Sequence, residues 1–116
     1  MEHRWGRRIV VDIPVYVTAA DRSRTMSAQL ANLSITGALI RADFRPRVLS
    51  HVQIVFASPQ GREEDLLSIS AYVVHNYRHG IGVEWFAPAS PAVSNLVTTG
   101  CAQFLPVRQN VSGIQQ

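Results

Sequence analysis

Apolar and polar residues alternate along most of the chain up to residue 86, a pattern typical of half-buried β-strands. In residues 9–17 every second residue from Val11 to Val17 is β-branched and apolar, which predicts a strand with one buried face. Pro14 lies within this run and has no backbone N–H to donate to a neighbouring strand. We therefore expect an open edge or a bulge at Pro14.

Five further segments have strand character, and Gly, Pro, Ser or Asp residues separate most of them. Short strands at this spacing indicate an antiparallel sandwich or barrel. A closed barrel also removes the unpaired edges that favour aggregation. We predict a mainly all-β fold, a six-stranded antiparallel β-barrel, whose later strands cover residues 25–33, 38–41, 51–57, 66–77 and 81–86.

The C-terminal part of the chain changes to a helical pattern. Ser90 is a candidate N-cap, and Pro91 suits the first helical position. Apolar residues then recur at roughly helical spacing: Ala92, Val93, Leu96, Val97 and Phe104. Residues 106–116 are polar, and we expect them to form a flexible tail. These features predict one domain over residues 1–105, with a C-terminal α-helix.

Composition narrows the functional classes. The chain of 116 residues carries a net charge of +3, and all eleven basic residues are arginine. Arginine binds phosphate and guanine through a planar fork of donors. The single cysteine, Cys101, excludes an internal disulfide and a multi-cysteine zinc site, and the scattered histidines suggest no metal centre. The sequence has no motif of a nucleophilic, paired-carboxylate or Walker-type enzyme, so we expect no catalysis.

The distribution of apolar residues also bears on where the protein is located. No apolar run approaches the roughly 20 residues of a membrane span. The N-terminal residues lack the apolar region of a secretion signal. We therefore expect a cytoplasmic protein without a transmembrane segment.

Two short segments carry candidate binding chemistry. The first is Arg4-Trp5-Gly6-Arg7-Arg8, directly before the first predicted strand. The second is Asn32-Leu33-Ser34-Ile35-Thr36-Gly37, where the second and third predicted strands meet. Asn32 and Ser34 are two residues apart and are expected on one face of a strand, and Gly37 allows a positive φ or the close approach of a ligand. Taken singly, the first segment is most often a solvated tail and the second ordinary turn chemistry.

Taken together and in this order, the two segments resemble the signature of the PilZ domain family, RxxxR followed by (D/N)xSxxG. Arg4 and Arg8 match the first motif; Asn32, Ser34 and Gly37 match the second, and 23 residues separate Arg8 from Asn32. Residues 80–85, Gly-Ile-Gly-Val-Glu-Trp, are similar to the late G-x-G-V-x-(F/W) strand of that family. The resemblance extends from residue 3 to about residue 105.

The resemblance implies a bacterial receptor for cyclic di-GMP, with no other cofactor. The implied ligand-binding residues are Arg4, Arg8, Asn32, Ser34 and Gly37. His3, Arg7 and His75 are candidates for additional contacts, although a histidine placed like His75 is more often an ordinary surface residue of a barrel strand. Many family members have another arginine where this chain has His3, and that arginine is associated with a stacked pair of ligands. Whether one or two cyclic di-GMP molecules bind is therefore open.

Three hypotheses remain for the function. In the first, cyclic di-GMP orders the N-terminal arginine segment and so changes the surface offered to an unidentified protein partner, which controls motility, exopolysaccharide export or pilus assembly. In the second, the chain is a PilZ-like adaptor that acts by protein–protein contact without the nucleotide. In the third, it is a small barrel that binds RNA or single-stranded DNA, although its nine aromatic residues form no basic-aromatic stripe. We expect no DNA or RNA partner, and the chain is expected to be a monomer or a homodimer.

Overall fold

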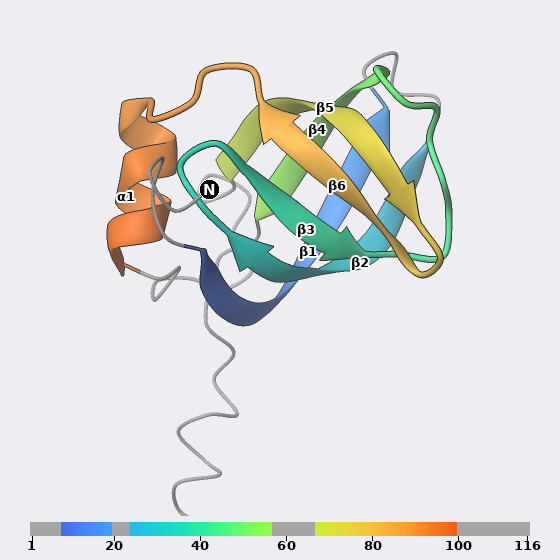
Figure 1. Cartoon of the computed structure of the whole chain (residues 1–116), viewed down its shortest axis with the longest axis horizontal. Helices are drawn as coiled ribbons and strands as arrows, with labels where there is room; N and C mark the ends of the chain where they lie inside the picture. Colours follow the sequence, from blue (N-terminus) through green and yellow to red (C-terminus); the bar gives the residue numbers. More distant parts are fainter. Residues whose placement is uncertain (1–7, 20–23, 57–66, 100–116) are drawn as a thin grey trace, which may run out of the picture.

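The computed structural model describes residues 8–19, 24–56 and 67–99, which form six strands and one helix (Figure 1). In chain order these are β1 (Ile9–Ala19), β2 (Thr25–Leu33), β3 (Gly37–Arg41), β4 (His51–Phe56), β5 (Leu67–Tyr77), β6 (Gly80–Trp85) and α1 (Pro91–Thr99). The strands close into a barrel in the order β1-β2-β3-β6-β5-β4, and every neighbouring pair is antiparallel. The predicted fold class is confirmed.

The strand boundaries differ from the predicted ones by one or two residues. β1 extends beyond Val17 because Thr18 still pairs with Thr25 of β2 and Ala19 with Val52 of β4. β6 begins at Gly80, which pairs with β3 and β5, and it ends one residue before Phe86. Positions 57 and 66, at the predicted ends of the fourth and fifth strands, lie outside the described residues.

The core fills the barrel with the inward-facing residues of all six strands. Alternation along β4 shows the principle, because Val52, Ile54 and Phe56 are buried while the residues between them are partly exposed. The largest side chains of the core are Trp85 and Phe56, each at most 1% exposed. Burial of this continuous apolar surface is the main favourable term in the folding free energy.

The pairing of β1 with its two neighbouring strands shows how the sheet accommodates Pro14. Pro14 pairs with Gln29 of β2, whereas the pairing of β1 with β4 begins only at Val15. The register between β1 and β2 shifts between Val10 and Ile13, so the bulge lies just before the proline. The described residues thus give Pro14 a partner strand on one side only, which is where a residue without an N–H is tolerated.

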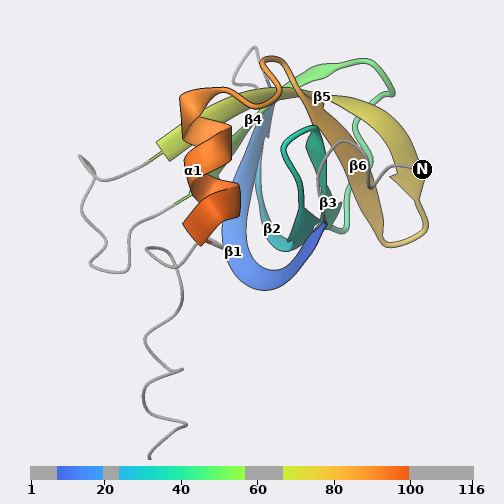
Figure 2. The ribbon, with the colours of Figure 1, turned by 60° about the vertical axis from the view of Figure 1, so that its left-hand side comes forward.

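Helix α1 lies across one end of the barrel (Figures 1 and 2). Its predicted start is confirmed: the Ser90 hydroxyl accepts a hydrogen bond of 3.3 Å from the backbone N–H of Val93, and the helix begins at Pro91. Val93 and Leu96 are fully buried and belong to the same cluster as the barrel core. Cys101, Phe104 and the expected tail lie outside the described residues. Within the described part of the chain, α1 is too short to cross a membrane.

Candidate functional site

The candidate site begins at the tight turn between β2 and β3. The backbone N–H of Ser34 donates to the carbonyl of Gly37 over 2.8 Å. The Ser34 hydroxyl accepts from the backbone N–H of Thr36 over 3.2 Å and lies 3.0 Å from the Thr36 hydroxyl. These bonds satisfy the polar groups of Ser34, which is only 2% exposed. Ser34 therefore stabilises the turn from inside.

The turn is also fixed from the side of β6. The indole Nε1–H of buried Trp85 donates to the carbonyl of Ser34 over 2.9 Å, and the Trp85 backbone N–H donates to the carbonyl of Thr36 over 3.0 Å. Just beyond β6, the N–H of Ala89 donates to the carbonyl of Ile35 over 3.0 Å. Three consecutive carbonyls of the turn are therefore bound, which holds its backbone in a single conformation.

Gly37 is needed for a reason that the sequence analysis did not identify. A Cβ atom at Gly37 would lie 2.1 Å from the carbonyl oxygen of Val83, far inside contact distance. The φ of Gly37 is not positive, so of the two reasons expected for this glycine the left-handed conformation does not apply. Its glycine lets the backbones of β3 and β6 approach closely.

A bulge in β2 turns Asn32 outward. Leu30 pairs with Ile40 of β3, but Asn32 pairs with Leu39, so Ala31 is an extra residue. The bulge allows Leu30 and Leu33 to be fully buried although they are three positions apart. Asn32 and Ser34 consequently do not share a strand face as expected, because β2 ends at Leu33 and Ser34 turns into the interior.

Arg8 contacts Asn32 across the start of the β1–β2 pair. The guanidinium Nη1–H of Arg8 donates to the Asn32 side-chain oxygen over 2.8 Å. The adjoining pairing of Val10 with Asn32 places these residues side by side. The hydrogen bond orients the guanidinium group, which is otherwise exposed to solvent.

Arg8 and Asn32 lie at the edge of a hollow of about 260 Å³ on the outer surface of β3, β6 and β5. Gly82 forms part of its floor, and Glu84 is the acidic residue that lines it. The full lining is Arg8, Asn32, Thr36, Gly37, Ala38, Leu39, Val74, His75, Tyr77, Gly82, Val83 and Glu84. The hollow therefore combines one cation, one anion, amide and hydroxyl groups, and two rings.

The two rings belong to His75 and Tyr77 on β5. Their centroids are 4.3 Å apart with an angle of 43° between the planes. A Cβ at Gly82 would be 3.4 Å from the Tyr77 ring, so the ring lies over this glycine. Sequence reasoning selected His75 but missed Tyr77. The period of two along a strand would have found it, because residues 75 and 77 lie on the same face.

The structure brings together four of the residues selected from the sequence: Arg8, Asn32, Gly37 and His75. Ser34 lies outside the lining and supports the turn beside it. His3, Arg4 and Arg7 lie outside the described residues, as does Trp5. Within the described segments, no group of three or more His, Cys, Asp and Glu side chains is placed to hold a metal ion.

Comparison with known proteins gives the family. The family model for the PilZ domain matches residues 2–103. No curated protein sequence matches the chain. Among solved structures, the crystal structure of the PilZ domain of CeSA from a cellulose-synthesizing bacterium has a TM-score of 0.67 and 21% identity, and the match covers 80% of this chain and 96% of that one.

A second solved structure, the Bacillus subtilis inhibitor of motility MotI/DgrA, has a TM-score of 0.63 and 13% identity. The match covers all of this chain and 55% of that protein, so this chain spans about half its length. At these identities the two structures support the fold. Because the family model matches almost the whole sequence, the chain belongs to the PilZ domain family.

Proposed function

We propose that this chain is a regulatory receptor domain, not an enzyme, which binds cyclic di-GMP in the hollow on the outer surface of β3, β6 and β5. The observation that carries the proposal is the 2.8 Å hydrogen bond between Arg8 and Asn32 at the edge of that hollow, with Gly37 on its floor. One residue of the arginine motif and two of the second motif thus meet around one surface, in a member of the PilZ family.

The side chains suit a guanine dinucleotide chemically. Guanine presents the acceptors N7 and O6 on one edge, and a guanidinium group binds that edge or a phosphate through two parallel hydrogen bonds. Arg8 has five N–H donors, so donating to Asn32 leaves others for the ligand. The amide nitrogen of Asn32 adds two donors on the same side of the hollow.

The rings of His75 and Tyr77 add a surface on which a base can stack. Tyr77 is 48% exposed and lies over Gly82, so one face of the ring system is open toward the hollow. Aromatic side chains stack on any base and gain roughly 1–3 kcal/mol per base. We therefore include Tyr77 with His75 as proposed ligand contacts.

Arg4, together with His3 and Arg7, completes the proposed ligand contacts from the segment that precedes Arg8. In this proposal the segment closes over the bound nucleotide and so changes the surface presented to a protein partner. Ser34 contributes indirectly, since its hydroxyl and carbonyl hold the turn that carries Gly37. The adaptor that acts without nucleotide is the competing hypothesis.

Isothermal titration calorimetry with cyclic di-GMP tests the proposal, with GTP and cyclic di-AMP as competing ligands. We expect selective binding of cyclic di-GMP, and the stoichiometry decides between one and two ligands per chain. Arg8→Ala removes the charge and the bond to Asn32, so we expect at least a tenfold loss of affinity, about 1.4 kcal/mol or more. Arg24→Ala is the matched control, because Arg24 is exposed and does not line the hollow.

Two results would contradict the proposal. Normal binding by Arg8→Ala would show that the ligand occupies another surface. No heat and no change in melting temperature with cyclic di-GMP would favour the adaptor.

A further inference from the structure

Five of the six arginines of the described segments gather at the end of the barrel opposite α1. Arg41 pairs with Gly80 in the β5–β6 hairpin, and the Arg45 Nε–H donates to the carbonyl of Tyr77 over 2.8 Å. Arg24 lines a shared hollow with Arg45. The complete set, named here the arginine end, is Arg24, Arg41, Arg45, Arg47 and Arg78, all of them exposed.

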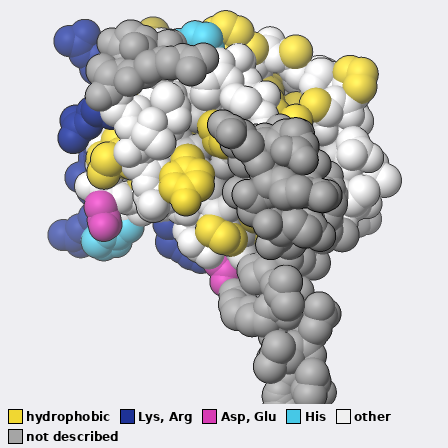
Figure 3. Space-filling view, turned by 180° about the vertical axis from the view of Figure 1, so that it is seen from behind, with side chains coloured by type: hydrophobic (Ala, Val, Ile, Leu, Met, Phe, Trp, Pro, Cys, Tyr) yellow, Lys and Arg dark blue, Asp and Glu magenta, His cyan; other side chains and the backbone are white. Residues whose placement is uncertain are grey.

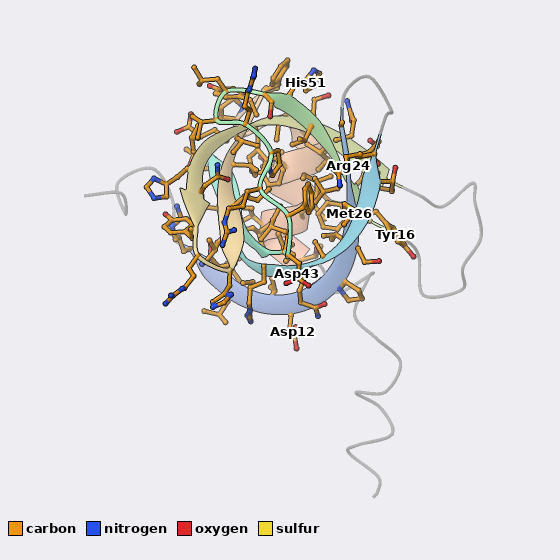
Figure 4. The ribbon with its side chains drawn as sticks, turned by 90° about the vertical axis from the view of Figure 1, so that its right-hand side faces the viewer. Asp12, Tyr16, Arg24, Met26, Asp43 and His51 are labelled. Atoms are coloured by element: carbon orange, nitrogen blue, oxygen red, sulfur yellow. The ribbon has the colours of Figure 1, made fainter. Side chains whose placement is uncertain are left out.

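Figure 4 looks at this end along the barrel, with α1 behind it, and Figure 3 shows dark blue side chains along the corresponding edge of the molecule. In the described segments that carry these five arginines, residues 24–28, 41–50 and 76–80, Asp43 is the only acidic residue. Such a concentration of one charge attracts an anionic surface over distances of about a Debye length, roughly 10 Å at 0.1 M salt.

An exposed apolar turn lies on the same rim, in the loop that crosses this end between β3 and β4. Val48 is 46% exposed and Leu49 is 74% exposed. Leu49 has φ of 75°, a conformation that favours glycine or asparagine in a turn and is strained for leucine. The turn itself therefore does not call for leucine at this position, and what Leu49 supplies is an apolar side chain directed outward.

The backbone of this turn is largely hydrogen-bonded within the protein. The N–H of Leu49 donates to the carbonyl of Val73 over 2.6 Å, and the N–H of Ser50 donates to the carbonyl of Arg47 over 3.0 Å. The Ser50 hydroxyl donates to that same carbonyl. A turn with its backbone groups satisfied can enter a poorly hydrated environment at a smaller desolvation cost.

We propose that the arginine end docks on an anionic phospholipid membrane surface, with Val48 and Leu49 inserted among the headgroups. The guanidinium groups would bind the lipid phosphates, and the apolar turn would add burial of its side chains. A nucleic acid is a poorer match, because Phe44 of this loop packs against the core and the exposed ring of Tyr77 lies over Gly82, in the separate hollow beside His75. This inference does not depend on cyclic di-GMP binding.

Co-sedimentation of the full chain with vesicles tests the inference. Vesicles of phosphatidylcholine alone are compared with an equimolar mixture of phosphatidylcholine and phosphatidylglycerol, at low and high salt. We expect binding to the anionic vesicles only, with a fall at high salt. Leu49→Gly relieves the strained turn and removes the apolar side chain, so we expect about tenfold weaker binding from a fully folded protein.

Single-charge variants separate the arginine end from general charge. Arg47→Gln is expected to weaken binding about fivefold, whereas Arg8→Gln, at the other end of the barrel, leaves it unchanged. Val10→Ala is the control for Leu49→Gly, because Val10 is 86% exposed but lies near Arg8.

Three outcomes would overturn the inference. The first is equal binding to neutral and anionic vesicles. The second is an equal effect of the Arg47 and Arg8 variants on vesicle binding. The third is a protein that does not bind vesicles but binds a single-stranded oligonucleotide or a polyglutamate peptide, with weaker binding by the Arg47→Gln variant. That result would assign the surface to the oligonucleotide or the peptide.

Discussion

At the scale of single residues, Gly37 and Gly82 lie in the same hollow but have different surroundings. A methyl group at Gly37 would lie 2.1 Å from the Val83 carbonyl, so Gly37→Ala must push β3 away from β6. We expect this variant to lower the free energy of unfolding by about 3 kcal/mol. Urea denaturation followed by circular dichroism measures the change.

Gly82→Ala is the matched control for Gly37→Ala. Its methyl group would meet the Tyr77 ring at 3.4 Å, an ordinary contact with a side chain that can move. We expect a loss of less than about 1 kcal/mol from this change. Equal losses for the two variants would contradict the close approach of β3 and β6 as the reason for Gly37.

His51 provides a second prediction for a single residue. Its ring stacks on Phe86 with centroids 4.3 Å apart, and its buried Nε2 atom has no hydrogen-bond partner among the described residues. His51→Phe keeps the stacked ring and removes the unsatisfied nitrogen, so we expect a gain of about 1 kcal/mol in the free energy of unfolding. Thermal unfolding checks this against His79→Phe, an exposed position where little change is expected. A destabilised His51→Phe protein would show that the nitrogen has a partner in solution.

At the scale of elements, the turn between β2 and β3 depends on β6. Trp85→Phe keeps a buried ring but deletes the indole donor, which leaves the Ser34 carbonyl without its 2.9 Å bond. We expect a loss of about 2 kcal/mol in stability and faster hydrogen exchange at residues 34–37. Affinity for cyclic di-GMP should also fall, although Trp85 does not line the hollow.

Phe56→Leu is the control for a general loss of stability. Phe56 is fully buried on β4, where it pairs with Val15 of β1 and Leu67 of β5, and none of these three residues lines the hollow. We expect a comparable loss of stability with unchanged affinity. If both variants weaken ligand binding equally, Trp85 has no specific positioning role.

The strands and the helix also show which features could be predicted from the sequence and which could not. Alternation located all six strands and Ser90-Pro91 located the helix, because both signals are local. Alternation cannot reveal where a strand gains an extra residue, and the bulges at Ala31 and Val74 reset the faces of β2 and β5. For this reason Asn32 faces the hollow, whereas Ser34 turns inward because β2 ends at Leu33. The close contact of Gly37 with Val83 could not be predicted from the sequence either, because it depends on the non-sequential pairing of β3 with β6.

At the scale of the whole molecule, α1 and the barrel share one core. Val93 and Leu96 are fully buried in the same cluster as the inward side chains of the strands, so the helix closes one end of the barrel. Leu96→Ala leaves a cavity at that end, and we expect a loss of about 3 kcal/mol. If helix and barrel unfold as one cooperative unit, amide exchange in all six strands should accelerate by a similar factor.

Asn95→Ala is the control within α1, because Asn95 is exposed and its replacement should change stability by less than about 0.5 kcal/mol. Protection lost in α1 alone, with the strand amides of Leu96→Ala unchanged, would show that the helix unfolds separately.

The shared core also has a consequence for the candidate site. The chain between β6 and α1 carries Ala89, whose N–H binds the carbonyl of Ile35 in the β2–β3 turn. Loosening of α1 should therefore reach the candidate site, and Leu96→Ala should also speed exchange at residues 34–37.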